Sequence, residues 1–527
     1  MNTRVYFNNF LHLLFLCGFI FCADAQQQQT FTIEPIPTWT SLIEVADYNN
    51  PLENEADSGV FCLLYDVEIN GGTQERFVHF ATKFLTTEGV EANSSISFNF
   101  DPSYQQLVLH KVVIHRGNQI IDELDQSKIR LIQQEKELDR QIYNGAKTAL
   151  LFLEDVRVGD WVEYAYTIRG RNPVEDGHFY DVLQLRWPFP IQTENYRLLW
   201  PRANQPLRAQ FSEDFPKNYK ITGQYYEYYW HWENRPGQEA EDFLPTWSMP
   251  YSMAFFSDFR TWTDVANWAS KSFEPTNCSD ALYQKAMAWR NEDVSDEQRV
   301  VEALQFVQDD IRYLGIENGV GSHEATDPSI VLARGYGDCK DKALLFCTIL
   351  RFFDNVKAMP ILVSTRFRAE VEALDPPTPL FFDHVIVQVV VDGKTYYVDT
   401  TRSFQRGLLD RRFIDLYYEG LSLSEDSSGL IAIPTTDNGL PKSVLDENFD
   451  ISSSGATKLA VTNTFEGRDA DFKRQELATL MCCFSWNWKK GWVELYNRAA
   501  TKGPIWQNNN DDISPARRRS KSYGSIF

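Results

Sequence analysis

Two β-rich runs on either side of an Asp-Gly pair constrain this sequence most strongly. The run HVIVQVVV begins at His384, the run KTYYVD ends at Asp399, and Asp392-Gly393 lies between them. Asp-Gly in this setting is typical of a two-residue type I′ turn, which pairs the last residue of the first run with the first residue of the second. Counting outward, His384 and Asp399 fall on the same face as diagonal neighbours. Such neighbours lie about 7–8 Å apart, within side-chain reach.

The segment GYGDCKDKALLFC predicts a helix that begins at Cys339. Asp338 is a good N-cap residue, and Asp341 stands where a capping box places its acid. Gly335 and Gly337 permit a tight turn before the helix. A helix N-terminus favours a thiolate, and its free N–H groups can hold a developing oxyanion. The two neighbouring acids oppose the thiolate, so a base is needed.

These features together predict a catalytic triad with Cys339 as nucleophile, His384 as base and Asp399 as the residue that orients the base. Each residue also has an ordinary structural interpretation. Cys339 fits a small buried core cysteine, His384 a strand histidine with a satisfied hydrogen bond, and Asp399 a strand-end acid. The shared face of the histidine and the acid, downstream of a cysteine at a helix N-terminus, favours the triad.

RGYGDCKDKALLFCTIL followed by DHVIVQVVVDGKTYYVDTT resembles the transglutaminase-like superfamily of papain-like cysteine enzymes, over about residues 295–405. The resemblance implies the same three roles for Cys339, His384 and Asp399. The upstream segment, with WVEY at Trp161 and WPFP at Trp187, is similar to the β-rich domain of unknown function 3857, which commonly precedes such a core in bacterial exported proteins. Residues 445–475 resemble the start of a third, β-rich domain, which ends early in a basic, Asn-rich tail.

We therefore expect an α+β fold: a transglutaminase-like (papain-like) core flanked by an N-terminal antiparallel β-sandwich-type domain and a short C-terminal β region. Prolines at 236, 245 and 250 indicate a boundary after the N-terminal domain. The expected parts are a signal peptide (1–25), the β-rich domain of unknown function (26–245), the catalytic core (246–425), a partial C-terminal β domain (426–500) and a disordered basic tail (501–527).

Alternation and turn residues predict the N-terminal strands, and 3.6-residue periodicity predicts the core helices. Ser295 and Gln298 are expected to form a capping box before a helix. The expected strands are Val60–Val67, Phe77–Phe84, Leu107–His115, Ala149–Leu153, Trp161–Ile168 and Tyr225–Trp232. The expected helices include Ala281–Trp289, a helix with the apolar stripe Val300, Val301, Leu304, Val307 and Ile311, and a short helix near Ser329–Ala333.

The N-terminus predicts export. Arg4 supplies a positive charge, Phe10–Phe21 is an apolar run, and Ala23-Asp24-Ala25 fits a cleavage site, so the mature chain is expected to begin at Gln26. The apolar run is short for a membrane span, and no later segment approaches a spanning length. We expect a periplasmic or secreted protein with no integral membrane segment after signal removal.

Composition narrows the partners. The chain of 527 residues carries a net charge of -22, which disfavours a nucleic-acid partner because phosphate binding needs a basic face. The sequence has no HExxH, no CxxC pair, no phosphate loop and no EF-hand, so we expect no metal and no other cofactor. The cysteines form no disulfide scaffold. A Cys62–Cys278 bridge is conceivable, and Cys339 is expected to be free of Cys347, which lies too far along the helix.

Three weaker candidates accompany the triad. Tyr313, or a backbone N–H near it, could complete an oxyanion hole, against plain core packing. His323 could line the cleft, against a solvated loop histidine. The aromatic run Tyr225–Trp232 could stack on sugar rings, against an aromatic-rich strand pair in a sandwich.

The predicted reaction is acyl transfer. The leading hypothesis is hydrolysis of a peptide or amide bond, by a protease or a cell-wall peptide amidase. The first alternative is a protein-glutamine transglutaminase, in which an amine replaces water. The second is a non-catalytic envelope binding or scaffold protein with a vestigial triad. The expected partners are a protein or peptide substrate, or a cell-wall peptide or glycan.

Overall fold

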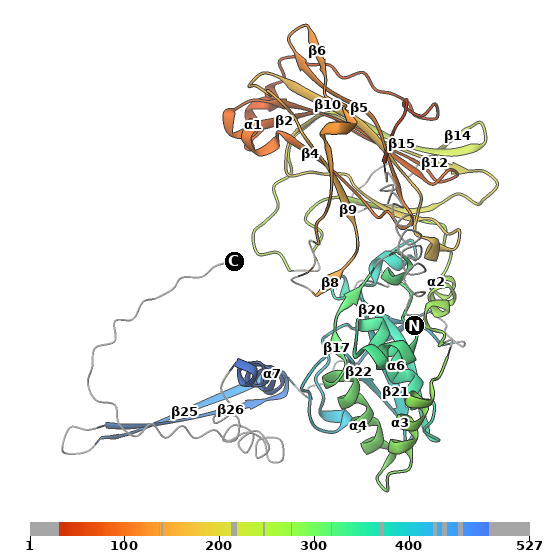
Figure 1. Cartoon of the computed structure of the whole chain (residues 1–527), viewed down its shortest axis with the longest axis vertical. Helices are drawn as coiled ribbons and strands as arrows, with labels where there is room; N and C mark the ends of the chain where they lie inside the picture. The colour runs from red at the N-terminus through yellow and green to blue at the C-terminus, as the bar shows by residue number, and fades with distance from the viewer. Residues whose placement is uncertain are drawn as a thin grey trace, which may run out of the picture.

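The computed structural model describes residues 31–483, except 136–137, 139–140, 212–218, 246–247, 276, 318, 369–370, 372–373, 425–428, 435–439 and 452–456. The expected signal peptide and basic tail lie outside the described residues. The chain has a β-rich N-terminal part and an α+β core, shown in the upper and lower halves of Figure 1. We refer to them as the N-terminal part and the core.

A large twisted sheet forms most of the N-terminal part. Its strands, in spatial order, are β1 (Phe31–Ile33), β5 (Gln106–Arg116), β10 (Trp161–Arg169), β3 (Glu75–Phe84), β2 (Val60–Asn70), β12 (Ile191–Pro201), β15 (Tyr225–Arg235) and β14 (Tyr219–Thr222), with β6 (Gln119–Asp122) paired to β5. Helix α1 (Thr87–Asn93) follows β3. The six strands expected from the sequence are all present, each within a few residues of its expected bounds.

The expectation of a purely antiparallel N-terminal domain is wrong at two strand pairs. Strand β1 runs parallel to β5, and β12 runs parallel to β2. A parallel pair needs a long crossover connection, and about 120 residues separate β2 from β12. No short-range sequence pattern reports such a pairing.

Two three-stranded sheets pack against the large one. The first, β4 (Ser95–Phe100), β9 (Lys147–Phe152) and β7 (Ile129–Gln133), shares a buried cluster with β5 that includes Phe98, Leu109 and Leu151. The second consists of β11 (Tyr180–Gln184), β16 (Met253–Ser257) and β13 (Arg208–Phe211). Strand β16 lies beyond residue 245, so the pairing of the N-terminal part extends into the segment that leads to the core.

The core places helices against a five-stranded antiparallel sheet. The sheet order is β22 (Lys394–Val398), β21 (His384–Val391), β20 (Val356–Val363), β23 (Glu419–Ser422) and β24 (Leu430–Ala432). The helices are α2 (Trp262–Ser270), α3 (Asp280–Arg290), α4 (Asp296–Asp309), α5 (Pro328–Arg334) and α6 (Cys339–Leu350). Helix α6 is buried along almost its whole length and contacts β20 and β21.

The predicted core helices are confirmed, with one local difference. The expected apolar stripe from Val300 to Ile311 is buried, although α4 ends at Asp309. Ser295 caps α4 by accepting from the N–H of Gln298. The Gln298 side chain donates to Glu302 one turn along the helix and not back to the cap, so the reciprocal half of the expected capping box is not present.

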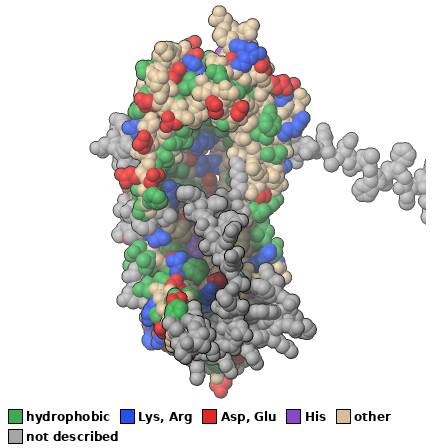
Figure 2. Space-filling view, turned by 90° about the vertical axis from the view of Figure 1, so that its left-hand side faces the viewer, with side chains coloured by type: hydrophobic (Ala, Val, Ile, Leu, Met, Phe, Trp, Pro, Cys, Tyr) green, Lys and Arg blue, Asp and Glu red, His purple; other side chains and the backbone are tan. Residues whose placement is uncertain are grey.

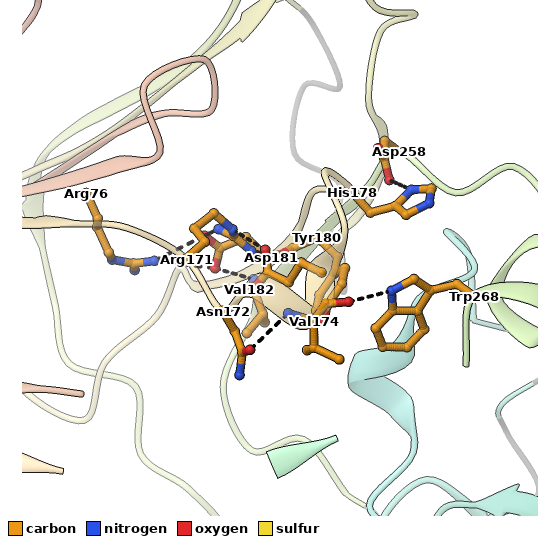
Figure 3. Close-up of polar contacts among 11 residues, drawn as sticks. Arg76, Arg171, Asn172, Val174, His178, Tyr180, Asp181, Val182, Asp258 and Trp268 are labelled. Atoms are coloured by element: carbon orange, nitrogen blue, oxygen red, sulfur yellow. Dashed lines mark hydrogen bonds and ion pairs between the residues drawn. The ribbon is translucent and has the colours of Figure 1, made fainter. Parts of the chain in front are cut away.

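The two parts are joined largely through main-chain groups. The indole N–H of Trp268 on α2 donates to the carbonyl of Val174 at 2.9 Å (Figure 3). The side-chain amide of Asn172 donates to the carbonyl of Gly319 at 2.8 Å and to the hydroxyl of Ser322 at 2.9 Å. The two parts are therefore held at several points around one loop of the core.

A short strand pair adds to this junction. Strand β8 (Ile142–Tyr143) of the N-terminal part pairs in parallel with β18 (Gly315–Ile316) of the core. The N–H of Gly315 donates to Gln141 and the N–H of Glu317 donates to Tyr143, both at 2.8 Å. In Figure 1 this segment reaches from the upper part down to the core.

The C-terminal segment begins with a hairpin of β25 (Lys442–Ile451) and β26 (Thr457–Glu466), which extends away from the core in Figure 1. Strands near residues 445–468 were expected. Helix α7 (Gly467–Cys483) follows and was not expected. Its first turns contact the core, where Asp471 accepts from Gln405 and Arg474 donates to the carbonyl of Phe404.

Candidate active site

Cys339 is the first residue of α6, as the sequence predicted. Oδ1 of Asp338 accepts from the N–H groups of Lys340 and Asp341, at 3.1 and 3.2 Å, and Oδ2 of Asp341 accepts from the N–H of Asp338 at 3.3 Å. Both halves of the expected capping box are present. Gly337 is required here, because a Cβ at this position would lie 2.6 Å from Cβ of Asp341. The cap leaves the N–H of Cys339 outside the groups that Asp338 takes up.

The two acids at this helix N-terminus are paired with cations. Lys340 donates to Oδ2 of Asp338, and Arg334 donates to Oδ2 of Asp341 at 2.5 Å. Burial raises the pKa of Asp338, against the Lys340 charge. The opposition to a thiolate expected from these acids is therefore reduced by two cations that the sequence reasoning did not use.

The hairpin brings His384 and Asp399 together. The predicted register is confirmed, with Val391 opposite Lys394, and both turn residues have positive φ, 51° for Asp392 and 73° for Gly393. Nε2 of His384 lies 3.0 Å from Oδ2 of Asp399. Diagonal placement on one face, derived from the turn alone, therefore gives a direct hydrogen bond.

Asp399 is fixed on its other oxygen. Its Oδ1 accepts from the N–H and the hydroxyl of Thr401, at 2.8 and 2.7 Å, and Arg402 lies 3.7 Å from Oδ2. Burial alone raises the pKa of Asp399, but the His384 charge and these hydrogen bonds outweigh burial and lower it well below its ordinary value. The carboxylate therefore stays ionised and faces the imidazole.

The imidazole is held in its charged form. Burial alone lowers the pKa of His384, but the Asp399 charge and hydrogen bond, together with a hydrogen bond to Cys339, raise it well above its ordinary value. Because Nε2 faces Asp399, the other ring nitrogen, Nδ1, is left for the thiol. This is the arrangement of a thiolate–imidazolium pair oriented by an acid.

Cys339 and His384 line one cleft of about 380 Å³, at the junction between the two parts. In Figure 2 the visible face of the molecule is hollowed at the level where the two parts meet. The apolar lining includes Trp268, Phe273, Leu362, Phe382 and, from the N-terminal part, Ile142. The polar lining includes Asn144, Glu317, Ser322, His323, Lys340 and Asp383.

His323 lies in this cleft, where the sequence placed it as a candidate. Its Nδ1 lies 2.8 Å from the hydroxyl of Ser322, and its ring meets Trp268 edge to face. Burial, with the Lys340 charge, lowers the pKa of His323 to about 4. The ring is therefore neutral at neutral pH, and Asn172 of the N-terminal part holds the Ser322 hydroxyl that contacts it.

Tyr313, the other secondary candidate, belongs to β17 (Arg312–Tyr313), which pairs in parallel with β19 (Tyr336–Gly337) just before the nucleophile. Burial and the charges of Cys339 and Asp338 raise the pKa of its phenol. The neighbouring N–H groups of Arg312 and Leu314 already donate to the carbonyls of Gly335 and Gly337. Tyr313 thus lies electrostatically close to the nucleophile, while those two amides are occupied.

A buried polar network behind the triad was missed. The side-chain amide of Gln308, on α4, donates to the carbonyl of Asp399 at 2.8 Å. Nζ of Lys342, on α6, donates to the carbonyls of Gln308 and Ile311. These contacts join the nucleophile helix to the strand end that carries the acid. A lysine on the apolar side of a predicted helix was the only signal in the sequence.

A second cavity, of about 320 Å³, lies beside the triad. It is lined by His384 and Asp399 but not by Cys339. Arg402, Asp415, Phe413 and Tyr417 of the core and the first turns of α7 complete it. The imidazole therefore separates two hollows, and the nucleophile lies in only one of them.

The aromatic strand β15 alternates as a sandwich strand does. Tyr228 and Trp230 are buried in the N-terminal part, whereas Tyr229 on the opposite face is 44% exposed. Trp230 therefore packs in the core of the sheet. Stacking on a sugar stays a hypothesis for Tyr229.

The described cysteines Cys62, Cys278, Cys339 and Cys347 are all free. The conceivable Cys62–Cys278 bridge is not formed, because Cys62 is buried in the large sheet and Cys278 is exposed at the start of α3. Among the described residues, no group of three His, Cys, Asp or Glu side chains is arranged to hold a metal ion. Within the same ranges, no helix combines the length and the apolar character that crossing a membrane requires.

Residues 70–238 match the family model "Domain of Unknown Function with solved-structure structure (DUF3857)". This match agrees with the resemblance drawn for the N-terminal domain. No curated protein matches the chain.

Solved structures resemble the chain in fold. A structure described as a putative protease from Parabacteroides distasonis is 15% identical, covers 72% of this chain and 73% of its own, and superimposes with a TM-score of 0.56. A structure described as a putative cysteine protease from Cytophaga hutchinsonii is 11% identical, covers 64% of this chain and 78% of its own, and has a TM-score of 0.18, too low to carry an argument. The chain therefore shares its fold with a protease-like structure at low identity.

Proposed function

We propose that this protein is an exported cysteine-dependent acyl-transfer enzyme that hydrolyses peptide or amide bonds. Cys339 is the nucleophile, His384 the general base and acid, and Asp399 the residue that orients and charges the imidazole. The observation that carries the proposal is the 3.0 Å contact between His384 and Asp399, made beside a cysteine at a helix N-terminus in the same cleft.

In the first half-reaction the Cys339 thiolate attacks the carbonyl carbon of the scissile amide. The charge that develops on the carbonyl oxygen is stabilised by donors at the helix N-terminus, of which the N–H of Cys339 is the nearest to the sulfur. The His384 imidazolium then gives its proton to the leaving nitrogen. The C–N bond breaks, the amine departs and an acyl thioester remains on Cys339.

In the second half-reaction His384, now neutral, removes a proton from water as the water attacks the thioester. The C–S bond breaks, the acid product leaves and the proton returns the pair to its charged form. Asp399 stabilises the imidazolium at both ends of the cycle, in agreement with the raised pKa of His384.

The same triad supports transfer to an amine, which is the alternative reaction. The protease-like fold favours water as the acceptor, and so does the cleft, which borders polar groups such as Asn144, Ser322 and His323. Export, with a protein or a cell-wall peptide as substrate, is part of the proposal and rests on the N-terminal sequence.

Incubation of the mature protein with denatured casein and a fluorescent primary amine tests the proposal. The expected result is the appearance of new peptide N-termini that depends on Cys339 and His384, with little amine incorporation. Incorporation of the amine without cleavage would replace hydrolysis by transamidation. Absence of both reactions, with Cys339→Ser indistinguishable from wild type, contradicts an enzymatic role for the triad.

A further inference from the structure

The segment that carries β8 comes from the N-terminal part and yet borders the cleft of the nucleophile. Ile142 and Asn144 line the same cleft as Cys339 and His384. The segment is tied to the core by the main-chain bonds from Gly315 and Glu317. The matched family domain therefore supplies one wall of the cleft.

The direction of those bonds leaves one face of the segment unpaired. Carbonyls of Gln141 and Tyr143 accept from the core, so the main chain of Ile142, between them, points to the opposite edge. In the part of the chain that the structure describes, the N–H and C=O of Ile142 have no hydrogen-bond partner. An unpaired strand edge of this kind is a template for another extended chain.

The unpaired edge is one residue long. The next residue that points outward is Asn144, and its N–H donates to Oε2 of Glu135 at 3.1 Å. One N–H and one C=O on the same residue, with the neighbouring donor occupied, fit a single two-bond pair with one residue of an extended peptide.

We propose that the main chain of Ile142 binds the main chain of an extended polypeptide substrate, on the acyl side of the scissile bond. This inference rests on the proposed function and names its substrate class. The acyl side is assigned because the acyl group stays on Cys339, in the cleft that Ile142 lines. The leaving side must reach His384, which also borders the second cavity, where Cys339 is absent.

The apolar part of the lining indicates what the docked chain carries. Trp268, Phe273 and Phe382 face the same cleft, so an apolar side chain near the scissile bond is favoured. A glutamine side-chain amide would enter without its main chain and could not use the Ile142 edge. Main-chain docking therefore selects a polypeptide backbone and disfavours an isolated side-chain amide.

The test uses acetylated eight-residue peptide amides that tile denatured β-casein. Their binding to the whole chain carrying Cys339→Ser is measured by fluorescence anisotropy, and their cleavage by the wild-type protein is measured separately. The tightest peptide is then N-methylated at one backbone position at a time. We expect one acyl-side position at which methylation weakens binding about fivefold or more, the size of one lost hydrogen bond.

Two variants probe the protein side. Ile142→Pro removes the free N–H and is expected to weaken the unmethylated peptide by a similar factor and to abolish the effect of methylation. Ile142→Val keeps the main chain and is the matched control. If Ile142→Pro does not fold, the methylation series on the otherwise unaltered chain still decides.

The outcomes separate this inference from the proposed function. A flat methylation series, or one position affected equally in Ile142→Pro, overturns docking on Ile142 even if the peptides are cleaved. A methylation-sensitive position in binding, with no peptide cleaved by the wild type, supports docking and overturns hydrolysis. If no peptide binds, docking is overturned, and cleavage of whole casein then judges the enzyme alone.

Discussion

Nζ of Lys342 lies 2.6 Å from the carbonyl oxygen of Ile311, inside the core, where the lysine side chain has no exposure to solvent. The contact ties the nucleophile helix α6 to the segment that follows α4. Burial lowers the pKa of Lys342 to about 8, although the charges of Asp399 and Asp309 oppose the shift.

This contact predicts an alkaline gain in stability. The unfolded chain keeps Lys342 protonated up to about pH 10.5, so between about pH 8 and pH 10.5 the unfolded state binds more protons and the free energy of unfolding rises with pH. Relative to Lys342→Met, the wild type should gain up to about 3 kcal/mol over this range. Urea unfolding at several pH values measures the gap, and the exposed Lys357→Met is the control. A pH-independent gap would refute the assignment.

Alkylation by iodoacetamide tests the nucleophile. Cys339 should react faster at neutral pH than Cys278, an exposed thiol in the same chain that serves as the internal reference. Replacing His384 by Ala should slow Cys339 by roughly tenfold or more, because the thiolate loses the charge that stabilises it, and should leave Cys278 unchanged. Equal rates for the two cysteines in the wild type would count against an activated pair.

The acid sets the pH profile. The raised pKa of His384 means that the imidazolium survives well above its ordinary pKa of 6.5, so reactivity that needs the charged pair should persist through that pH. Asp399→Asn removes the charge that raises this pKa, so the alkaline loss of the pair should move to lower pH. The variant should also lower kcat/KM by about 100-fold or more. Asp383→Asn, in the same cleft but bonded to Thr365, should leave the profile in place.

A buried acid in the N-terminal part predicts a stabilising substitution. Asp66 is fully buried, and its Oδ1 accepts from the side-chain amide of Asn195 at 2.7 Å. Among the described residues, Oδ2 of Asp66 and Oδ1 of Asn195 have no partner, which a proton on Asp66 would supply to both. Burial, then the Glu68 charge, raises the pKa of Asp66 to about 8.

A raised pKa in a folded acid removes stability as pH rises from the unfolded value near 4 to about 8. Asp66→Asn replaces that proton by a permanent N–H, so it should raise the free energy of unfolding at pH 7 by roughly 1–4 kcal/mol. Denaturant melts from pH 5 to pH 8 should show the gain growing with pH, whereas the exposed Asp57→Asn shows none. A destabilised Asp66→Asn protein would contradict the protonated pair.

The sequence predicted the parts of the site that short-range geometry determines. A two-residue turn sets the register that joins His384 to Asp399, and an N-cap sets the position of Cys339, so local patterns sufficed. The pairing of Lys340 and Arg334 with the two acids of the cap is also local, but the charge count alone pointed the other way.

Residues that reach the site from a distance were not predictable. Gln308 and Lys342 acquire their roles from the packing of α4 on α6, and Ile142 and Asn144 arrive from another part of the chain. The parallel strands and helix α7 were missed for the same reason: a crossover or a docking contact is decided by partners far away in sequence. The polar contacts of Gln298 show that even a good local motif is settled by its neighbours.

The junction between the two parts has a consequence for how such chains can change. Its bonds end on the carbonyls of Gln141, Tyr143, Val174 and Gly319, which every amino acid possesses. Substitutions at these four positions can alter the surface while the acceptors stay in place. Two parts docked in this way can drift apart in sequence without coming undocked, and a comparison of residue identities across the boundary would reveal little of their attachment.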